Sequence, residues 1–161
     1  MDNPKIVNIQ NRFIVGKNIH TTLATNDTIG LWQQFRPKVH TIPNRLGTDF
    51  FSVHVYPDNF RLENFTLETK FQKWAAVEVS SFDDIPNEFD VLTLTGKYAV
   101  FMHHGPANVF EATLNHIYNE WLPGSGFQLD ARPHFEILPA NYRPDDPNAW
   151  EEVWRPIIEM D

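Results

Sequence analysis

Glu136 is the residue whose type and surroundings point most directly to chemistry. It stands in the run HFEIL, residues 134–138, where alternation places His134, Glu136 and Leu138 on one face of a strand. An ionised carboxylate among apolar neighbours is costly to bury unless a cation or hydrogen-bond donors meet it. We therefore expect Glu136 either to face a ligand groove or to pair with Arg132 or His134 at a sheet edge.

Four further candidates for ligand binding lie on two predicted strands: His54 and Tyr56 in residues 49–56, and Trp74 and Glu78 in residues 71–80. Period-two alternation predicts that all four share the face of Glu136. The rings of Trp74 and Tyr56 could stack on a bound compound or attract a cation, although aromatic residues on strands also pack in cores. Trp121, on the apolar stripe of a predicted helix, either packs in the core or reaches the groove.

Two kinds of function fit these residues, and the sequence leaves both open. A groove with apolar walls and a central carboxylate would bind a hydrophobic, cationic or aromatic compound. Alternatively, if Glu78 and Glu136 stand close together, like-charge repulsion and burial would raise the pKa of one of them. One carboxyl group could then activate water while the other protonates a leaving group, with His54 or Tyr56 assisting. That arrangement describes a metal-independent hydrolase.

Metal sites and nucleophilic residues are not expected. The chain has no cysteine, which excludes thiol catalysis and disulfides. His103 and His104 are adjacent and point to opposite sides of a strand, so together they cannot hold a metal ion. Ser125 lies in a Pro-Gly-Ser-Gly helix stop and not in the strand-to-helix turn that exposes a nucleophilic serine. We therefore expect no cofactor.

Composition and charge describe a folded, acidic chain. Of its 161 residues, 42% are hydrophobic, and the formal net charge is −8 without any cluster of Lys or Arg. Because nucleic-acid-binding proteins present a basic face, direct binding to nucleic acid is not expected. The acidic charge suits a cationic ligand or simply confers solubility. Neither a signal peptide nor an apolar run of membrane-spanning length is visible, so we expect a cytoplasmic location.

Hydrophobic periodicity predicts an α+β fold with a mostly antiparallel sheet. Helices are expected near residues 26–40 and 107–121, and strands at residues 5–19, 49–56, 71–80, 92–94, 97–104, 133–139 and 150–158. Both halves then read strand, helix, strand, strand, as pseudo-repeats of about 1–81 and 88–161 within a single domain, 1–161. We expect both helices on one face of the sheet and the ligand groove on the other. The residues assigned to the helix side are Phe51, Val53, Val55, Ala75, Val77, Val79, Phe135 and Ile137.

Several segments resemble one known family. They are KYAVFMHHGP at 97–106, EWLPGSG at 120–126, RPHFE at 132–136 and RPI at 155–157, with YPD at 56–58 and WAAVEVSS at 74–81 upstream. Together they resemble the GyrI-like small-molecule-binding domain, also called the AraC-type effector-binding domain. The resemblance implies a duplicated strand-helix-strand-strand fold that binds hydrophobic, often cationic or aromatic compounds between its halves, with Glu136 as the pocket carboxylate. Leu138 departs from the family pattern, in which an aromatic residue is common at this position.

The same resemblance implies a choice of biological roles. Many family members are fused to DNA-binding domains in multidrug-responsive regulators, whereas others stand alone. The latter include gyrase-inhibitor-like proteins and hydrolases of reactive cyclopropane-bearing natural products. Because the match extends over nearly the whole chain, the resemblance implies the stand-alone type. The expected partner is a small molecule, with a protein such as gyrase as the alternative, and no nucleic acid or membrane is expected to bind directly.

Overall fold

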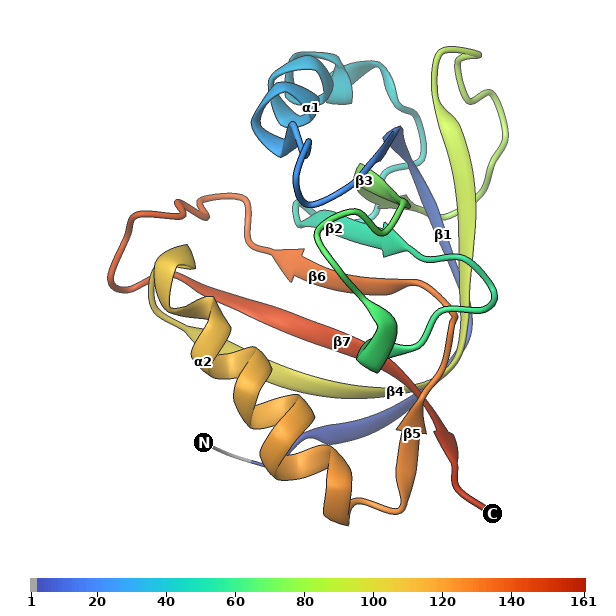
Figure 1. Ribbon diagram of the computed structural model, residues 1–161. Helices are drawn as coiled ribbons and strands as arrows, with labels where there is room; N and C mark the ends of the chain where they lie inside the picture. The colour runs from blue at the N-terminus through green and yellow to red at the C-terminus, as the bar shows by residue number, and fades with distance from the viewer. Residues whose placement is uncertain (1–2) are drawn as a thin grey trace.

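Residues 3–161 form a seven-stranded antiparallel sheet with two helical segments outside it in the computed structural model of the protein (Figure 1). The strands are β1 (Lys5–Thr21), β2 (Phe50–Val55), β3 (Phe71–Val79), β4 (Asp90–His104), β5 (Phe127–Leu129), β6 (His134–Leu138) and β7 (Trp150–Glu159). Their order is β4-β1-β3-β2-β6-β7-β5, and β4 also pairs with β7. This extra pairing closes the first six strands into a ring. The predicted α+β fold with a mostly antiparallel sheet is therefore confirmed.

Both predicted helices are present. Helix α1 (Thr28–Phe35) is capped at its N-terminus by Asp27, whose side chain accepts a hydrogen bond from the Gly30 backbone N–H. A 3-10 turn, Arg36–Thr41, continues the helix. The second segment runs from a 3-10 turn, Ala107–Val109, through α2 (Phe110–Asn115) and a π-helical turn, His116–Trp121, to a 3-10 turn, Leu122–Gly124. Strand β5, which sequence periodicity did not indicate, follows it and pairs with β7.

The sheet has an inner and an outer face, because the ring encloses a core of its own. The inner face is filled by a cluster to which all six strands of the ring contribute, namely Ile9, Ile14, Phe51, Val53, Trp74, Ala76, Leu94, Tyr98, Phe135, Ile137 and Trp154. On the outer face, α1 covers an apolar cluster that includes Ala75, Val77 and Val79. The segment containing α2 covers another, built on Phe101, Ile117 and Val153. Apolar burial on both faces fixes the register of each strand.

The cavities beside Glu136 open on the same face as the helices, and not on the opposite face as predicted. Most of the opposite face is the packed interior of the ring, and Phe51, Val53, Phe135 and Ile137 point into it instead of lying beneath the helices. The placement of Ala75, Val77 and Val79 beneath α1 is confirmed. The error arises because β2 and β6 cross the gap between the two helices. There the outer face carries polar residues, so their apolar alternates turn inward.

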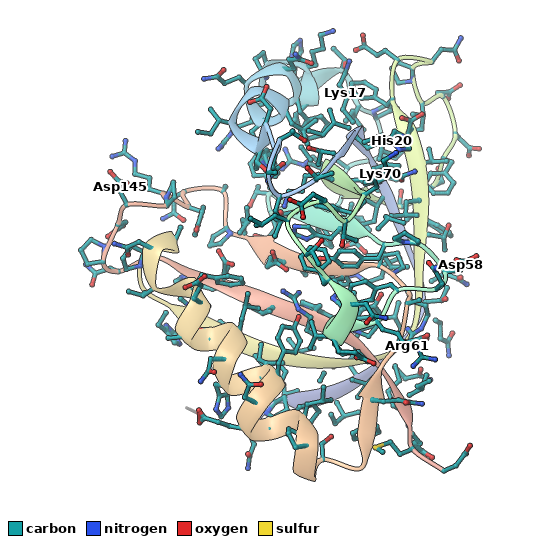
Figure 2. All side chains as sticks on the ribbon, in the orientation of Figure 1. Lys17, His20, Asp58, Arg61, Lys70 and Asp145 are labelled. Atoms are coloured by element: carbon teal, nitrogen blue, oxygen red, sulfur yellow. The ribbon has the colours of Figure 1, made fainter. Side chains whose placement is uncertain are left out.

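The connections beside that gap complete the surface around β6. Figure 1 shows α1 and α2 on the same side of the sheet, one at each end, with β6 and β7 between them. The β6–β7 connection, marked by Asp145 in Figure 2, projects from the sheet on this side, and the β2–β3 connection, marked by Asp58 and Arg61, descends in front of β7. No helix within residues 3–161 is long and apolar enough to cross a membrane.

Candidate functional site

Two cavities open on the outer face of the sheet, and Glu136 borders both of them. The α1-side cavity has a volume of about 480 Å³ and lies between α1 and the β6–β7 connection, where Trp32, Arg36, Phe50, Ser52, Tyr142 and Glu151 are among the residues that line it. The α2-side cavity has a volume of about 540 Å³ and is lined by residues that include His54, Tyr56, Phe60, Tyr118, His134 and Arg155. Volumes of this size suit drug-sized compounds.

Glu136 forms a buried ion pair with Arg155. Register places Glu136 of β6 opposite Ser52 of β2 and Val153 of β7, on the outer face. The Arg155 Nη1 donates to Glu136 Oε2 at 2.7 Å, and the two side chains are only 6% and 8% exposed. Arg155 Nε also donates to the Tyr118 hydroxyl at 2.8 Å. Burial opposes the charge of Arg155, but Tyr118 and Glu136 outweigh it and keep the pKa of Arg155 above its ordinary value.

Neither of the pairing partners considered from the sequence is the partner of Glu136. Arg132 donates to Asp130 at 2.5 Å and to the backbone carbonyl oxygens of Thr95, Lys97 and Ile157. His134 is 2% exposed, and its Nε2 has no hydrogen-bond partner within residues 3–161. Burial, and then the charge of Arg155, hold the pKa of His134 well below its ordinary value, so His134 is neutral.

Lys73 is a second buried cation near Glu136. It lies on β3, and its Nζ donates to Ser52 Oγ at 2.5 Å and contacts His54 Nε2 at 3.1 Å. Burial lowers the pKa of Lys73 to about 8, although Glu136 acts in the opposite direction. Burial and the charge of Lys73 keep the pKa of His54 well below its ordinary value. His54 is therefore a neutral acceptor for Lys73.

Glu151 is the second buried carboxyl group on this face and differs from Glu136 in having no cationic partner. It is 5% exposed, and no ion pair within residues 3–161 involves it. Burial, and then repulsion from Glu136, raise the pKa of Glu151 to about 7, while Tyr142, Arg155 and Lys73 favour the ionised form. Glu151 thus changes its charge near neutral pH.

The aromatic rings of the α2-side cavity pack mainly against one another. Tyr56 stacks on Phe60 with ring centroids 4.2 Å apart and meets the edges of Phe65 and His134 at 5.6 and 4.9 Å. Burial raises the pKa of Tyr56, so its hydroxyl stays protonated. Of the predicted ligand-binding residues, Glu136, Tyr56 and His54 therefore come together here.

The other three predicted site residues lie elsewhere. Trp74 is 4% exposed and belongs to the inner core. Glu78 also faces inward, where it accepts two hydrogen bonds of 2.8 Å from Arg12. Trp121 packs edge-on against Phe101 in the cluster beneath α2. The prediction that Trp74 and Glu78 share the face of Glu136 is wrong, because β3 presents them to the interior of the ring.

Sequence reasoning missed Arg155, Glu151 and Lys73. Alternation in the last predicted strand puts Glu151 and Arg155 on one face, together with Val153. It does not say whether that face points into the core or toward Glu136. Only the pairing of β7 with β6 and β4 brings these charges beside Glu136.

The fold and this site define an α+β small-molecule-binding domain, and the chain belongs to the GyrI-like family. The sequence profile of the GyrI-like small molecule binding domain matches residues 2–158. The transcriptional regulator BrlR of Pseudomonas aeruginosa is 27% identical over 137 residues, which are 83% of this chain and 48% of that protein. The chain thus spans about half the length of this curated relative.

Solved structures show the same fold at low sequence identity. SAV2435 bound to tetraphenylphosphonium superposes with a TM-score of 0.71 and 16% identity, covering 98% of this chain and 94% of that chain. A hydrolase from Listeria innocua superposes with a TM-score of 0.64 and 11% identity, covering 97% and 92%. These similarities establish the fold.

Proposed function

We propose that this protein binds hydrophobic aromatic compounds, cations among them, in the cavities on either side of Glu136. The observation that carries the proposal is the combination of two drug-sized cavities with aromatic walls and buried charged groups at their common border. Apolar and aromatic walls bury the body of a ligand, while a few fixed polar groups orient it. The family to which the chain belongs is a small-molecule-binding one.

The bound compound in a similar structure suggests a probe. SAV2435 binds tetraphenylphosphonium, a cation whose charge is shielded by four phenyl rings. Since BrlR is a transcriptional regulator, we propose that the corresponding domain here recognises an effector of this amphipathic kind.

Calorimetric titration tests this proposal. We expect saturable binding of both tetraphenylphosphonium and the neutral triphenylphosphine oxide, because the walls supply most of the contact area. Replacing Tyr118 or Trp32 with Ala should weaken the binding of at least one of the two compounds. If neither compound binds at concentrations up to the millimolar range, the protein does not have this function.

A hydrolytic function is a second candidate, favoured by the position of Glu151. Glu136 and Glu151 lie on the same face, and the pKa of Glu151, at about 7, suits a general base. Glu78 cannot form the pair with Glu136 that the sequence suggested, because it is on the inner face of the sheet. In this proposal Glu151 takes a proton from water as the water oxygen bonds to a strained cyclopropane carbon. The ring C–C bond breaks, its electron pair stays on the departing carbon, and that carbon takes the proton back from the Glu151 carboxyl group.

Mass spectrometry distinguishes the two candidates. A hydrolase would convert an electrophilic cyclopropane compound into its water adduct over many turnovers, and Glu151→Gln would abolish the conversion. A binding protein would release the compound unchanged. The neighbouring substitution Glu152→Gln, on the inner face, is the matched control.

A further inference from the structure

The two buried carboxylates on the outer face are not equivalent. Arg155 donates to Glu136 at 2.7 Å and also donates to the Tyr118 hydroxyl. Because the opposite charges of Glu136 and Arg155 cancel, this pair presents no net charge to a ligand. Glu151 has a similarly buried side chain but forms no ion pair within the described part of the chain. A buried carboxylate without a cation has lost much of its hydration and gains most from a cationic ligand.

The α2-side cavity is poorly suited to a cation. Its wall contains Arg155 and Glu136, whose charges offset each other. The rings of Tyr56 and Phe60 are stacked on each other, so the faces in that stack are not free to cover a positive charge. The single acidic residue at its mouth, Glu111, is exposed and is therefore screened by solvent and salt.

The α1-side cavity combines what a lipophilic cation needs. Glu151 lines it together with Trp32, Phe50 and Tyr142. The rings of Trp32 and Phe50 meet edge to face with centroids 5.8 Å apart, which leaves the cavity with a mostly apolar wall. Two cations lie near this end. Arg36 is exposed at the rim, where its guanidinium lies 4.5 Å above the ring of Phe50. Lys73 is buried and donates to Ser52, which lines the cavity.

We infer that the α1-side cavity is the site for lipophilic monocations and that Glu151, rather than Glu136, is the counter-ion of the ligand. Glu136 is then a positioning residue that holds Arg155 and separates the two cavities. This inference rests on the proposed small-molecule-binding function and assigns the cation to one of its two cavities.

Ionisation of Glu151 makes the inference testable without any substitution. The groups that face Glu151 are Glu136 on β6, Arg155 on its own strand, Lys73 on β3, Tyr142 on the β6–β7 connection and Arg36 beside α1. His103 of β4 stands opposite it in the register and is bound to Thr113 Oγ1 at 2.6 Å. With a pKa of about 7 for Glu151, its ionised fraction rises about tenfold between about pH 6 and about pH 8.

The experiment measures the dissociation constants of tetraphenylphosphonium and triphenylphosphine oxide for the whole chain at about pH 6 and about pH 8. The inference predicts that wild-type protein binds the cation about five- to tenfold more tightly at the higher pH, in step with ionised Glu151. Glu151→Gln should lose most of that pH dependence, keeping only the part that deprotonation of Lys73, whose pKa is about 8, contributes. It should bind the cation about tenfold more weakly at the higher pH. For the neutral compound, the dissociation constants of wild-type protein and Glu151→Gln should differ by less than about twofold at either pH.

Glu111→Gln is the matched control, because it removes the same charge at the mouth of the other cavity. It should retain the wild-type pH dependence. The inference is overturned if Glu151→Gln binds the cation as wild type does, or if Glu111→Gln has the larger effect. It is also overturned if cation affinity in wild-type protein does not change with pH. Failure of wild-type protein to bind either compound would instead contradict the proposed function itself.

Discussion

The two cavities meet at one carboxylate and yet present opposite environments to a ligand. On the α2 side, Arg155 is bound to Glu136 and Tyr118, and the ring of Tyr56 is stacked on that of Phe60. On the α1 side, Glu151 remains without an ion pair in residues 3–161 beside an apolar wall. The comparison therefore separates a buried carboxylate that already has a cationic partner, Glu136, from one that forms no ion pair in the described residues, Glu151.

The largest expected effect comes from breaking the ion pair between Glu136 and Arg155. Arg155→Met leaves the buried Glu136 without its ion-pair partner, so the free energy of unfolding should fall by about 3–5 kcal/mol. Urea denaturation measures it. The double variant Glu136→Gln/Arg155→Met should recover part of the loss. A loss below about 1 kcal/mol for the single variant would mean that Glu136 is not held by Arg155.

Glu151 should affect stability in the opposite sense. Its folded-state pKa of about 7 lies above the ordinary value of 4.5, so the folded state binds the proton more tightly than the unfolded state does. The unfolding free energy contributed by Glu151 is therefore complete below about pH 4.5 and falls as the pH rises to about 7. Glu151→Gln should stabilise the protein by up to about 3 kcal/mol at pH 8, and this gain should disappear near pH 4.5. A gain that did not vary with pH would show that Glu151 is not desolvated.

Aromatic substitutions should show which of the two cavities binds the cation. Trp32→Leu removes a wall of the α1-side cavity. The affinity for tetraphenylphosphonium should fall about tenfold, because apolar contact and cation–π attraction are lost. Phe60→Leu alters the α2-side stack and should change cation affinity less than about twofold. Fluorescence or calorimetric titration of the two variants makes the comparison, and the reverse order of effects would place the cation on the α2 side.

The smallest effect is expected at the rim. Arg36→Gln removes a positive charge that repels a cation entering the α1-side cavity, so affinity should rise about two- to threefold at low salt. Because Arg36 is exposed, the gain should vanish in about 0.5 M salt. A gain that persisted at high salt would indicate a change in cavity shape and not in charge.

The sequence was sufficient to place most of the elements. Alternation and helix signals located the strands around residues 49–56, 71–80 and 133–139, as well as both helices, within a few residues of their observed bounds. Only β5 was missed, and β4 is one strand where two were expected. These features are encoded locally, so periodicity and turn residues suffice to find them.

The faces of the strands could not be predicted in the same way. In β6, Phe135 and Ile137 suggest a core face, but the helices and the closed ring both offer one. The choice depends on the gap between α1 and α2, where Ser52 and Glu136 find polar partners. Likewise, the sequence of its own strand identified Glu136 as the central carboxylate. Recognising Arg155 and Glu151 as its neighbours requires knowing that β6 pairs with β7. The pairing of strands that are distant in the sequence cannot be predicted from any single segment of the chain.

The most direct measurement of the central claim is a crystal structure of the protein with tetraphenylarsonium, a cation of the same shape as tetraphenylphosphonium whose arsenic scatters anomalously. The account predicts an anomalous peak in the α1-side cavity, beside Glu151, Trp32 and Phe50, with the Glu136–Arg155 ion pair intact. A peak in the α2-side cavity among Tyr56, Phe60 and Tyr118, with Arg155 displaced from Glu136, would contradict it.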